Sequence, residues 1–128
     1  MSLLLAVMIA AQAPAAEATA WERVFQDAES TQYLDPASIR RDGAHMQVRW
    51  RFDFSQADGD DGMQRLIVNA LVDCRARIFL LRRVEGYRGD GSPIQAFDLP
   101  PDHPQAAAQA LSERDETTYR RVCGAGAR

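Results

Sequence analysis

Few residues of this chain have the type and spacing needed for catalysis or metal binding. Its two histidines are His45 and His103. Neither falls beside a cysteine or serine in the pattern of a nucleophile and its general base. Two histidines without a cysteine pair at ligand spacing also fall short of a zinc site. The sequence therefore predicts no catalytic residues, no metal and no cofactor, and it does not favour an enzyme.

The acidic run Asp58, Asp60 and Asp61 is the one stretch that suggests calcium. A calcium loop of the helix-loop-helix type needs oxygen ligands at alternate positions and a glutamate at its twelfth position. Counted from Asp58, the fifth position is Gly62 and the twelfth is Asn69. The pattern therefore predicts a solvated turn.

The tripeptide Arg88-Gly89-Asp90 is a short motif with a known binding chemistry. It resembles the integrin-recognition motif, in which the aspartate completes a metal's coordination and the arginine enters an acidic cleft. Flanking glycines predict a hairpin tip that projects both charges outward. Gly-Asp-Gly is also ordinary turn chemistry. Arg88, Gly89 and Asp90 are therefore a candidate partner-binding loop, with a plain turn as the alternative.

All fifteen basic residues are arginine, and the net charge is −3. This charge disfavours a nucleic-acid partner, which would need a basic footprint, and the absence of lysine excludes lysine-dependent chemistry. Four of the arginines fall on one predicted strand, with Arg75, Arg77 and Arg83 on one face and Arg82 on the other. We interpret them as a solvated face with acidic partners on neighbouring strands.

The element that must organise the fold is the strand from Ala44 to Phe54. Apolar and polar residues alternate along it, which is the two-residue period of a strand with one wet face. Its apolar members are Met46, Val48, Trp50, Phe52 and Phe54. Such a strand needs antiparallel neighbours and a layer over its apolar face. In 128 residues there is room for one domain.

Hydrophobic alternation and turn residues predict the other elements. The further strands are expected at Trp21–Gln26, Thr31–Leu34, Ser38–Arg41, Met63–Cys74, Arg75–Tyr87 and Ile94–Asp98. Asp35-Pro36 should end the strand Thr31–Leu34, Asp42-Gly43 should form a two-residue type I′ hairpin, and residues 55–62 should be a polar loop. In the strand Arg75–Tyr87, Ile78, Leu80 and Val84 are expected to point inward, with Phe79 and Leu81 opposite. An alanine-rich helix is predicted at Gln105–Ser112, followed after a charged run by a last helical turn that ends at Gly124 and covers one sheet face.

The first twenty residues predict a signal peptide, and residues 21–128 a single domain. Leu3–Ala13 is an apolar run too short to span a bilayer, followed by small residues that end in Ala18-Thr19-Ala20. Cleavage is expected after Ala20, with Ala15 as the alternative site and a buried N-terminal helix as the alternative interpretation. No cysteine precedes Cys74, so no lipid anchor is expected. The mature protein is predicted to be exported, periplasmic or at the cell surface, and not membrane-spanning.

The stretch from Tyr33 to Gly43, the alternating strand with Trp50, then Asp73-Cys74, Tyr87 and Cys123-Gly124 together resemble the surface-adhesin protein E family of exported bacterial proteins. The resemblance covers about Trp21 to Cys123. It implies an α+β fold with an antiparallel sheet of about six strands and a C-terminal helix packed on one face, tethered by a disulfide. The named member of the family is an adhesin that binds host matrix and serum proteins. Two departures are the missing lipidation cysteine and the missing lysines.

Cys74 and Cys123 are the only cysteines. In an exported chain they meet an oxidising compartment and have only each other as partners, so a disulfide is predicted, with two reduced core cysteines as the alternative. The sequence and the resemblance together predict a non-catalytic exported binding module, adhesin-like or envelope-associated, with a protein partner from the envelope or the host matrix. The alternative is a small periplasmic enzyme or enzyme subunit. A deep cleft with convergent polar groups would favour the enzyme, and a flat or loop-borne surface the module.

Overall fold

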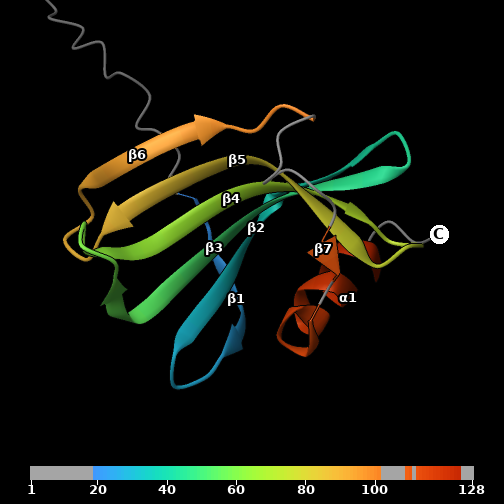
Figure 1. The fold of residues 1–128 in the computed structure, drawn as a ribbon. Coiled ribbons are helices and arrows are strands. Elements are labelled where there is room, and N and C mark those ends of the chain that lie inside the picture. The colour runs from blue at the N-terminus through green and yellow to red at the C-terminus, as the bar shows by residue number, and fades with distance from the viewer. Residues whose placement is uncertain (1–18, 102–108, 111, 125–128) are drawn as a thin grey trace, which may run out of the picture.

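Six strands follow one another in chain order and form one antiparallel sheet (Figure 1). The computed structural model describes residues 19–101, 109–110 and 112–124. The strands are β1 (Glu22–Gln26), β2 (Ser30–Asp42), β3 (His45–Asp58), β4 (Met63–Asp73), β5 (Ile78–Arg88) and β6 (Pro93–Asp98). A two-residue strand, β7 (Gln109–Ala110), pairs with the start of β5. The predicted sheet of about six antiparallel strands is confirmed.

The central strand β3 buries one face, as its alternation predicts. Met46, Val48 and Trp50 are all buried, and Trp50 is only 1% exposed. The indole Nε1 of Trp50 donates a hydrogen bond to Oε1 of Gln32 at 3.2 Å, so two buried polar atoms satisfy each other. These residues, with Val68, Ala70 and Val72 of β4, form the apolar core.

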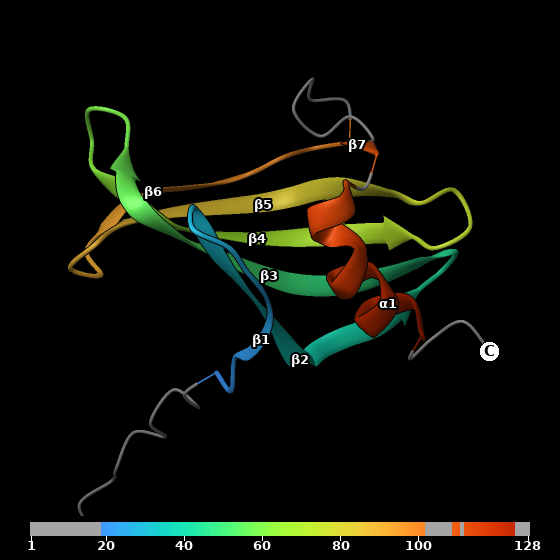
Figure 2. The same cartoon turned by 90° about the horizontal axis from the view of Figure 1, so that it is seen from below.

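A C-terminal helix covers this core (Figure 2). After a single turn of 3-10 helix, η2 (Glu113–Asp115), the helix α1 runs over Glu116–Gly124 and buries Val122 and Cys123 against the sheet. Cys123 is bonded to Cys74 at the end of β4. The hydroxyl of Tyr119 donates to the carbonyl oxygen of Cys74 at 2.5 Å. The predicted covering helix and its disulfide tether are both confirmed.

The sheet curls so that β1 lies on the same side as α1 (Figures 1 and 2). Arg121 of the helix bonds Glu22 of β1 at 2.8 Å. One face of the sheet is therefore closed by α1 and by the curled β1–β2 edge. No described helix or strand lies over the opposite face.

The strand β2 differs from the prediction. The expected strands Thr31–Leu34 and Ser38–Arg41 are parts of one strand, β2, whose pairing with β3 is interrupted between Asp35 and Arg40. Asp35 accepts a hydrogen bond from the backbone N–H of Ala37 at 3.1 Å. The Asp35-Pro36 signal thus produces a local irregularity within a strand and not a strand end.

The prediction of which β5 side chains point toward the core is wrong for the first half of the strand. Phe79, Leu81 and Val84 pack against the core. The reason is an extra residue: Asn69 pairs with Arg83 while Ala70 pairs with Leu81, so Arg82 is a bulge that shifts the alternation by one. Because this shift puts Arg82 and Arg83 on the same face, the separate faces expected for them are also wrong.

Three further predictions need correction. The hairpin before β3 turns at Gly43 and Ala44, and only Gly43 has positive φ (59°), which fits a type II′ turn. The polar loop is shorter than residues 55–62, because β3 continues to Asp58 and the turn occupies 59–62. The helix expected at Gln105–Ser112 is absent at Gln109–Ala110, which forms β7, and most of the rest of that segment lies outside the described residues.

Two expectations fall on the chain's first residues. The predicted signal peptide and its cleavage site lie almost wholly outside the described residues. In the part of the chain that the structure describes, no helix has the length and apolar character to cross a membrane.

Candidate functional site

The face of the sheet opposite α1 carries a gathering of charged and aromatic side chains. It is built by the alternate residues that the core does not use, and three rows of neighbours cross it from β3 through β4 to β5. We call this surface the open face; its rows are Arg49, Asn69 and Arg83, then Arg51, Ile67 and Glu85, then Asp53, Arg65 and Tyr87.

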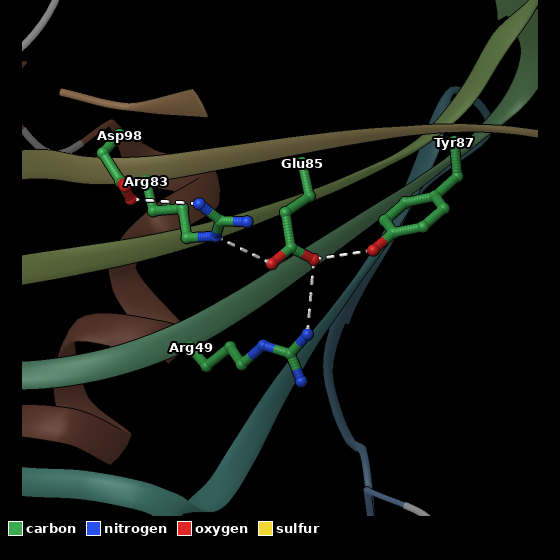
Figure 3. Close-up of polar contacts among 5 residues, drawn as sticks. All are labelled: Arg49, Arg83, Glu85, Tyr87 and Asp98. Atoms are coloured by element: carbon green, nitrogen blue, oxygen red, sulfur yellow. Dashed lines mark hydrogen bonds and ion pairs between the residues drawn. The ribbon is translucent and has the colours of Figure 1, made fainter. Parts of the chain in front are cut away.

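Glu85 is the centre of one polar network on the open face (Figure 3). Its carboxylate accepts a hydrogen bond from the Tyr87 hydroxyl at 2.7 Å, and it pairs with Arg83 at 3.2 Å and Arg49 at 3.4 Å. Arg83 also bonds Asp98 of β6 at 3.1 Å. The network therefore joins β3, β5 and β6 across the sheet.

The environment of Glu85 favours the ionised form of its carboxylate. Burial, the largest single influence, raises its pKa, but the hydrogen bond from Tyr87 and the two guanidiniums together outweigh burial and hold the pKa of Glu85 below its usual range. The same hydrogen bond raises the pKa of Tyr87, because ionised Tyr87 could no longer donate to the carboxylate. Near neutral pH, Glu85 is therefore held in its ionised form and Tyr87 in its neutral form.

A second network lies beside the first. Asp53 accepts hydrogen bonds from Arg51 at 2.8 Å and from Arg65 at 3.0 Å. Burial raises the pKa of Asp53, and the two arginines more than reverse this and lower it; the hydrogen bond with Asp53 raises the pKa of Arg51. The Arg51 guanidinium also lies over the ring of Tyr33, 4.4 Å from its centre.

Trp21 extends this surface at the N-terminal side. The guanidiniums of Arg49 and Arg51 lie 5.4 and 5.5 Å from the centre of its ring. Arginine and aromatic side chains are the residues most enriched at the energetically dominant points of protein interfaces. The open face thus has the composition of a recognition surface.

The open face contains a depression of about 500 Å³ between β2, β3, β4 and β5. Its lining combines three arginines and Asp42 with neutral polar and apolar side chains, among them Arg40, Arg49, Arg82, Gln47, Asn69 and Leu71. It lies where β2 loses its pairing with β3 and where β5 bulges. The backbone N–H of Arg49 bonds the Ser38 hydroxyl at 2.7 Å across the interrupted part of the β2–β3 ladder.

The candidate loop Arg88-Gly89-Asp90 lies in the β5–β6 turn, as the sequence predicts. Asp90 accepts a hydrogen bond from the backbone N–H of Ser92 at 2.8 Å, and Arg88 donates to the carbonyl oxygen of Pro93 at 3.2 Å. Hydrogen bonds from Ser92 lower the pKa of Asp90. Both charged side chains therefore help to shape the turn, and a role of this loop in partner binding stays a prediction.

The acidic loop and His45 form no metal site in the described structure, and His103 lies outside the described residues. Among residues 19–101, 109–110 and 112–124, no group of three or more metal-ligating side chains has a geometry that could hold a metal ion. Asp58 ends β3, and Asp60 and Asp61 occupy the turn that follows.

Sequence reasoning missed the open face as a site. It identified the wet residues of the central strand but treated each strand separately, and it divided Arg82 from Arg83. The signal that could have found the site is the pairing itself. Arg49 pairs with Asn69 and Arg51 with Ile67 on the next strand, and Glu85 lies beside Ile67 on the third.

Comparison with known proteins yields one family. No curated protein and no solved structure matches the chain significantly. A family model, described as surface-adhesin protein E, matches residues 21–124, which span the whole described sheet and the covering helix. This match implies an exported, adhesin-like protein. The chain belongs to the surface-adhesin protein E family.

Proposed function

We propose that this chain is an exported, non-catalytic binding module that holds a protein partner of the envelope or the host matrix on its open face. The observation that carries the proposal is the asymmetry of the sheet. One face packs its apolar residues under α1, whereas the other presents arginines, tyrosines and a tryptophan with no described element over them.

The electrostatics of the open face support binding over acid–base catalysis. A catalytic acid or base works best when its pKa lies near the working pH. Here the pKa values of Glu85 and Asp53 are lowered and those of Tyr87 and Arg51 are raised, so every resolved shift moves away from neutrality. Such groups keep fixed charges and fixed hydrogen bonds, which suits recognition.

The shape of the face supports the same proposal. Its depression is open and lies on a sheet surface, and the side chains of Arg40, Gln47 and Asp42 in its lining are bonded to one another. An adhesin-like role in this family also agrees with binding to another protein. Export is part of the proposal, and it rests on the predicted signal peptide and on the disulfide, which an oxidising compartment favours.

The test is capture of partners by immobilised mature protein, residues 21–128, from envelope and host-matrix fractions. Two double variants each remove two positive charges. Arg49→Gln with Arg83→Gln alters the open face, and Arg114→Gln with Arg120→Gln alters η2 and α1. Circular dichroism and thermal unfolding first establish that both are folded.

A partner retained by wild type and by the helix-side variant, and reduced about fivefold by the open-face variant, would support the proposal, because charged interface anchors dominate such contacts. Retention that is unchanged by the open-face variant would contradict it. The partner's intact mass after incubation is expected to be unchanged, and its cleavage or modification would contradict the non-catalytic assignment.

A further inference from the structure

The depression on the open face has an excess of positive charge. Its lining includes the guanidiniums of Arg40, Arg49 and Arg82, and Asp42 is the carboxylate among the lining residues. Asp42 is bonded at 3.0 Å to the neutral amide of Gln47 and forms no salt bridge with another described residue. Three positive groups therefore surround one negative group.

The three guanidiniums of the depression are only partly satisfied by the protein. Arg40 donates to the neutral Gln47 side chain at 3.2 Å. Among the described residues, the Arg82 guanidinium makes a single hydrogen bond, a long one of 3.5 Å to the carbonyl oxygen of Leu81. Arg49 has a carboxylate partner, but it shares Glu85 with Arg83 and Tyr87. A guanidinium has five N–H donors arranged to bind a carboxylate by two parallel hydrogen bonds.

Arg82 is directed to this position by the backbone. As the bulge residue of β5, it lies beside Arg83 on the open face, whereas unbroken alternation would have put the two on opposite faces. The β2 irregularity between Asp35 and Arg40 borders the same depression. Two breaks in regular pairing thus flank one cavity, and bulges are commonly found where a side chain must be re-aimed.

The remaining lining suits a peptide. Within the described part of the chain, no hydrogen bond joins the Asn69 side-chain amide to another residue, so it is available to a backbone carbonyl or N–H. Leu71 gives apolar surface between the arginines. A volume of about 500 Å³ lies within the range of roughly 300 to 1,000 Å³ that small-ligand sites occupy.

The distribution of charge favours a short acidic peptide over a larger polyanion as the ligand. The chain as a whole carries a charge of −3, so a nucleic acid or a sulfated polysaccharide would be repelled outside the depression. A short peptide segment with one or two carboxylates meets the local positive charge without that wider repulsion. We propose that the depression binds an acidic segment of a protein partner, with an Asp or Glu carboxylate between Arg82 and Arg49 and the peptide backbone at Asn69.

This inference rests on the proposed function, because it names the chemistry of the partner's contact with the open face. It is tested on the mature protein by NMR titration of ¹⁵N-labelled amides. The probe is the blocked peptide acetyl-Gly-Glu-Glu-Gly-amide, and its neutral counterpart is acetyl-Gly-Gln-Gln-Gly-amide. Inorganic phosphate and a sulfated heparin tetrasaccharide are titrated separately.

Saturable shifts at the amides of Arg49, Asn69 and Leu71 are expected with the glutamate peptide, and about tenfold weaker binding with the glutamine peptide, since charge-assisted pairs are roughly twice as strong as neutral ones. Arg82→Gln should weaken glutamate-peptide binding about fivefold or more. The matched control Arg120→Gln removes an equal charge from the exposed side of α1, where the arginine is paired to Glu116 at 3.4 Å, and should leave binding within about twofold.

Equal binding of the two peptides, equal effects of the two arginine variants, or no saturable shift would each overturn the proposal. Phosphate or the sulfated tetrasaccharide binding as tightly as the glutamate peptide would overturn it in favour of a general anion site. Peptide binding without partner capture on the open face would contradict the proposed function alone. Partner capture with no dependence on Arg82 would contradict the carboxylate site alone.

Discussion

The hydroxyl of Tyr87 donates a hydrogen bond of 2.7 Å to the Glu85 carboxylate two residues earlier on the same strand. Both side chains are on the open face, because residues two apart on a strand point to the same side. Glu85 is 15% exposed at its side chain and also receives Arg49 and Arg83. This arrangement fixes two arginines of the open face and links the stability of the sheet to pH.

Replacing Glu85 by glutamine should lower the free energy of unfolding at pH 7 by about 1 to 3 kcal/mol, the usual cost of removing one partner of charged, partly buried hydrogen bonds. Because the pKa of Glu85 is lowered in the folded state, the unfolded chain takes up the proton first as pH falls. The stabilisation is therefore present above the usual glutamate pKa of about 4.3. It is lost as pH falls through the pKa of Glu85 in the folded state. Urea unfolding at pH 7 and pH 3 measures both effects. The difference between wild type and Glu85→Gln should shrink at pH 3; a constant difference would contradict this account.

Removing the disulfide between α1 and the sheet should lower the free energy of unfolding by more than Glu85→Gln does. The Cys74–Cys123 disulfide closes a segment with a sequence separation of 49, and the loop-entropy model assigns such a link on the order of 4 kcal/mol. Cys74→Ala with Cys123→Ala should lower the urea midpoint by a corresponding amount, and wild type in reductant should behave like the variant. An unchanged melting temperature on reduction would show that the tether does not stabilise the fold.

The sequence predicts much of this fold because local patterns and global packing agree over most of the chain. The alternation at Met46, Val48 and Trp50 identifies the buried face, and Gly43 marks the hairpin that feeds the strand. The disulfide follows from two cysteines in a chain expected to be exported.

The remaining features depend on pairing between distant residues. Nothing local to β5 reveals that Arg82 is a bulge, since the extra residue is defined only against Asn69 and Ala70 on β4. The same holds for Gln109–Ala110, whose alanine-rich context favours helix but which pairs with Ile78 and Phe79 of β5. The open face was missed for the same reason, because its rows form only once three strands are in register.

Export should remove the first twenty residues. Cleavage after Ala20 would leave Trp21 as the first residue, and its ring already lies near the guanidiniums of Arg49 and Arg51. Mass spectrometry of the periplasmic or secreted protein should find a new N-terminus between Ala16 and Trp21. Cytoplasmic protein that retains Met1 would exclude the signal peptide.

The Arg88–Asp90 turn makes a separate prediction about host cells. If this loop contacts a receptor, Asp90→Glu should reduce cell attachment to immobilised mature protein, because the longer side chain keeps the charge but changes its reach. The substitution also disturbs the bond to the Ser92 N–H, so the thermal unfolding of both proteins is compared first. Equal attachment by both proteins, or none by either, would leave the loop a plain hairpin turn.

The central claim is that partners bind the face of the sheet opposite α1. It is tested most directly by photo-crosslinking in cells that express the full chain with benzoylphenylalanine at one position. Gln47 lines the depression, and Arg120 lies on the exposed side of the helix, 77% exposed at its side chain. We predict a discrete crosslinked partner from position 47 and none from position 120. A partner captured from position 120 and not from position 47 would contradict the claim.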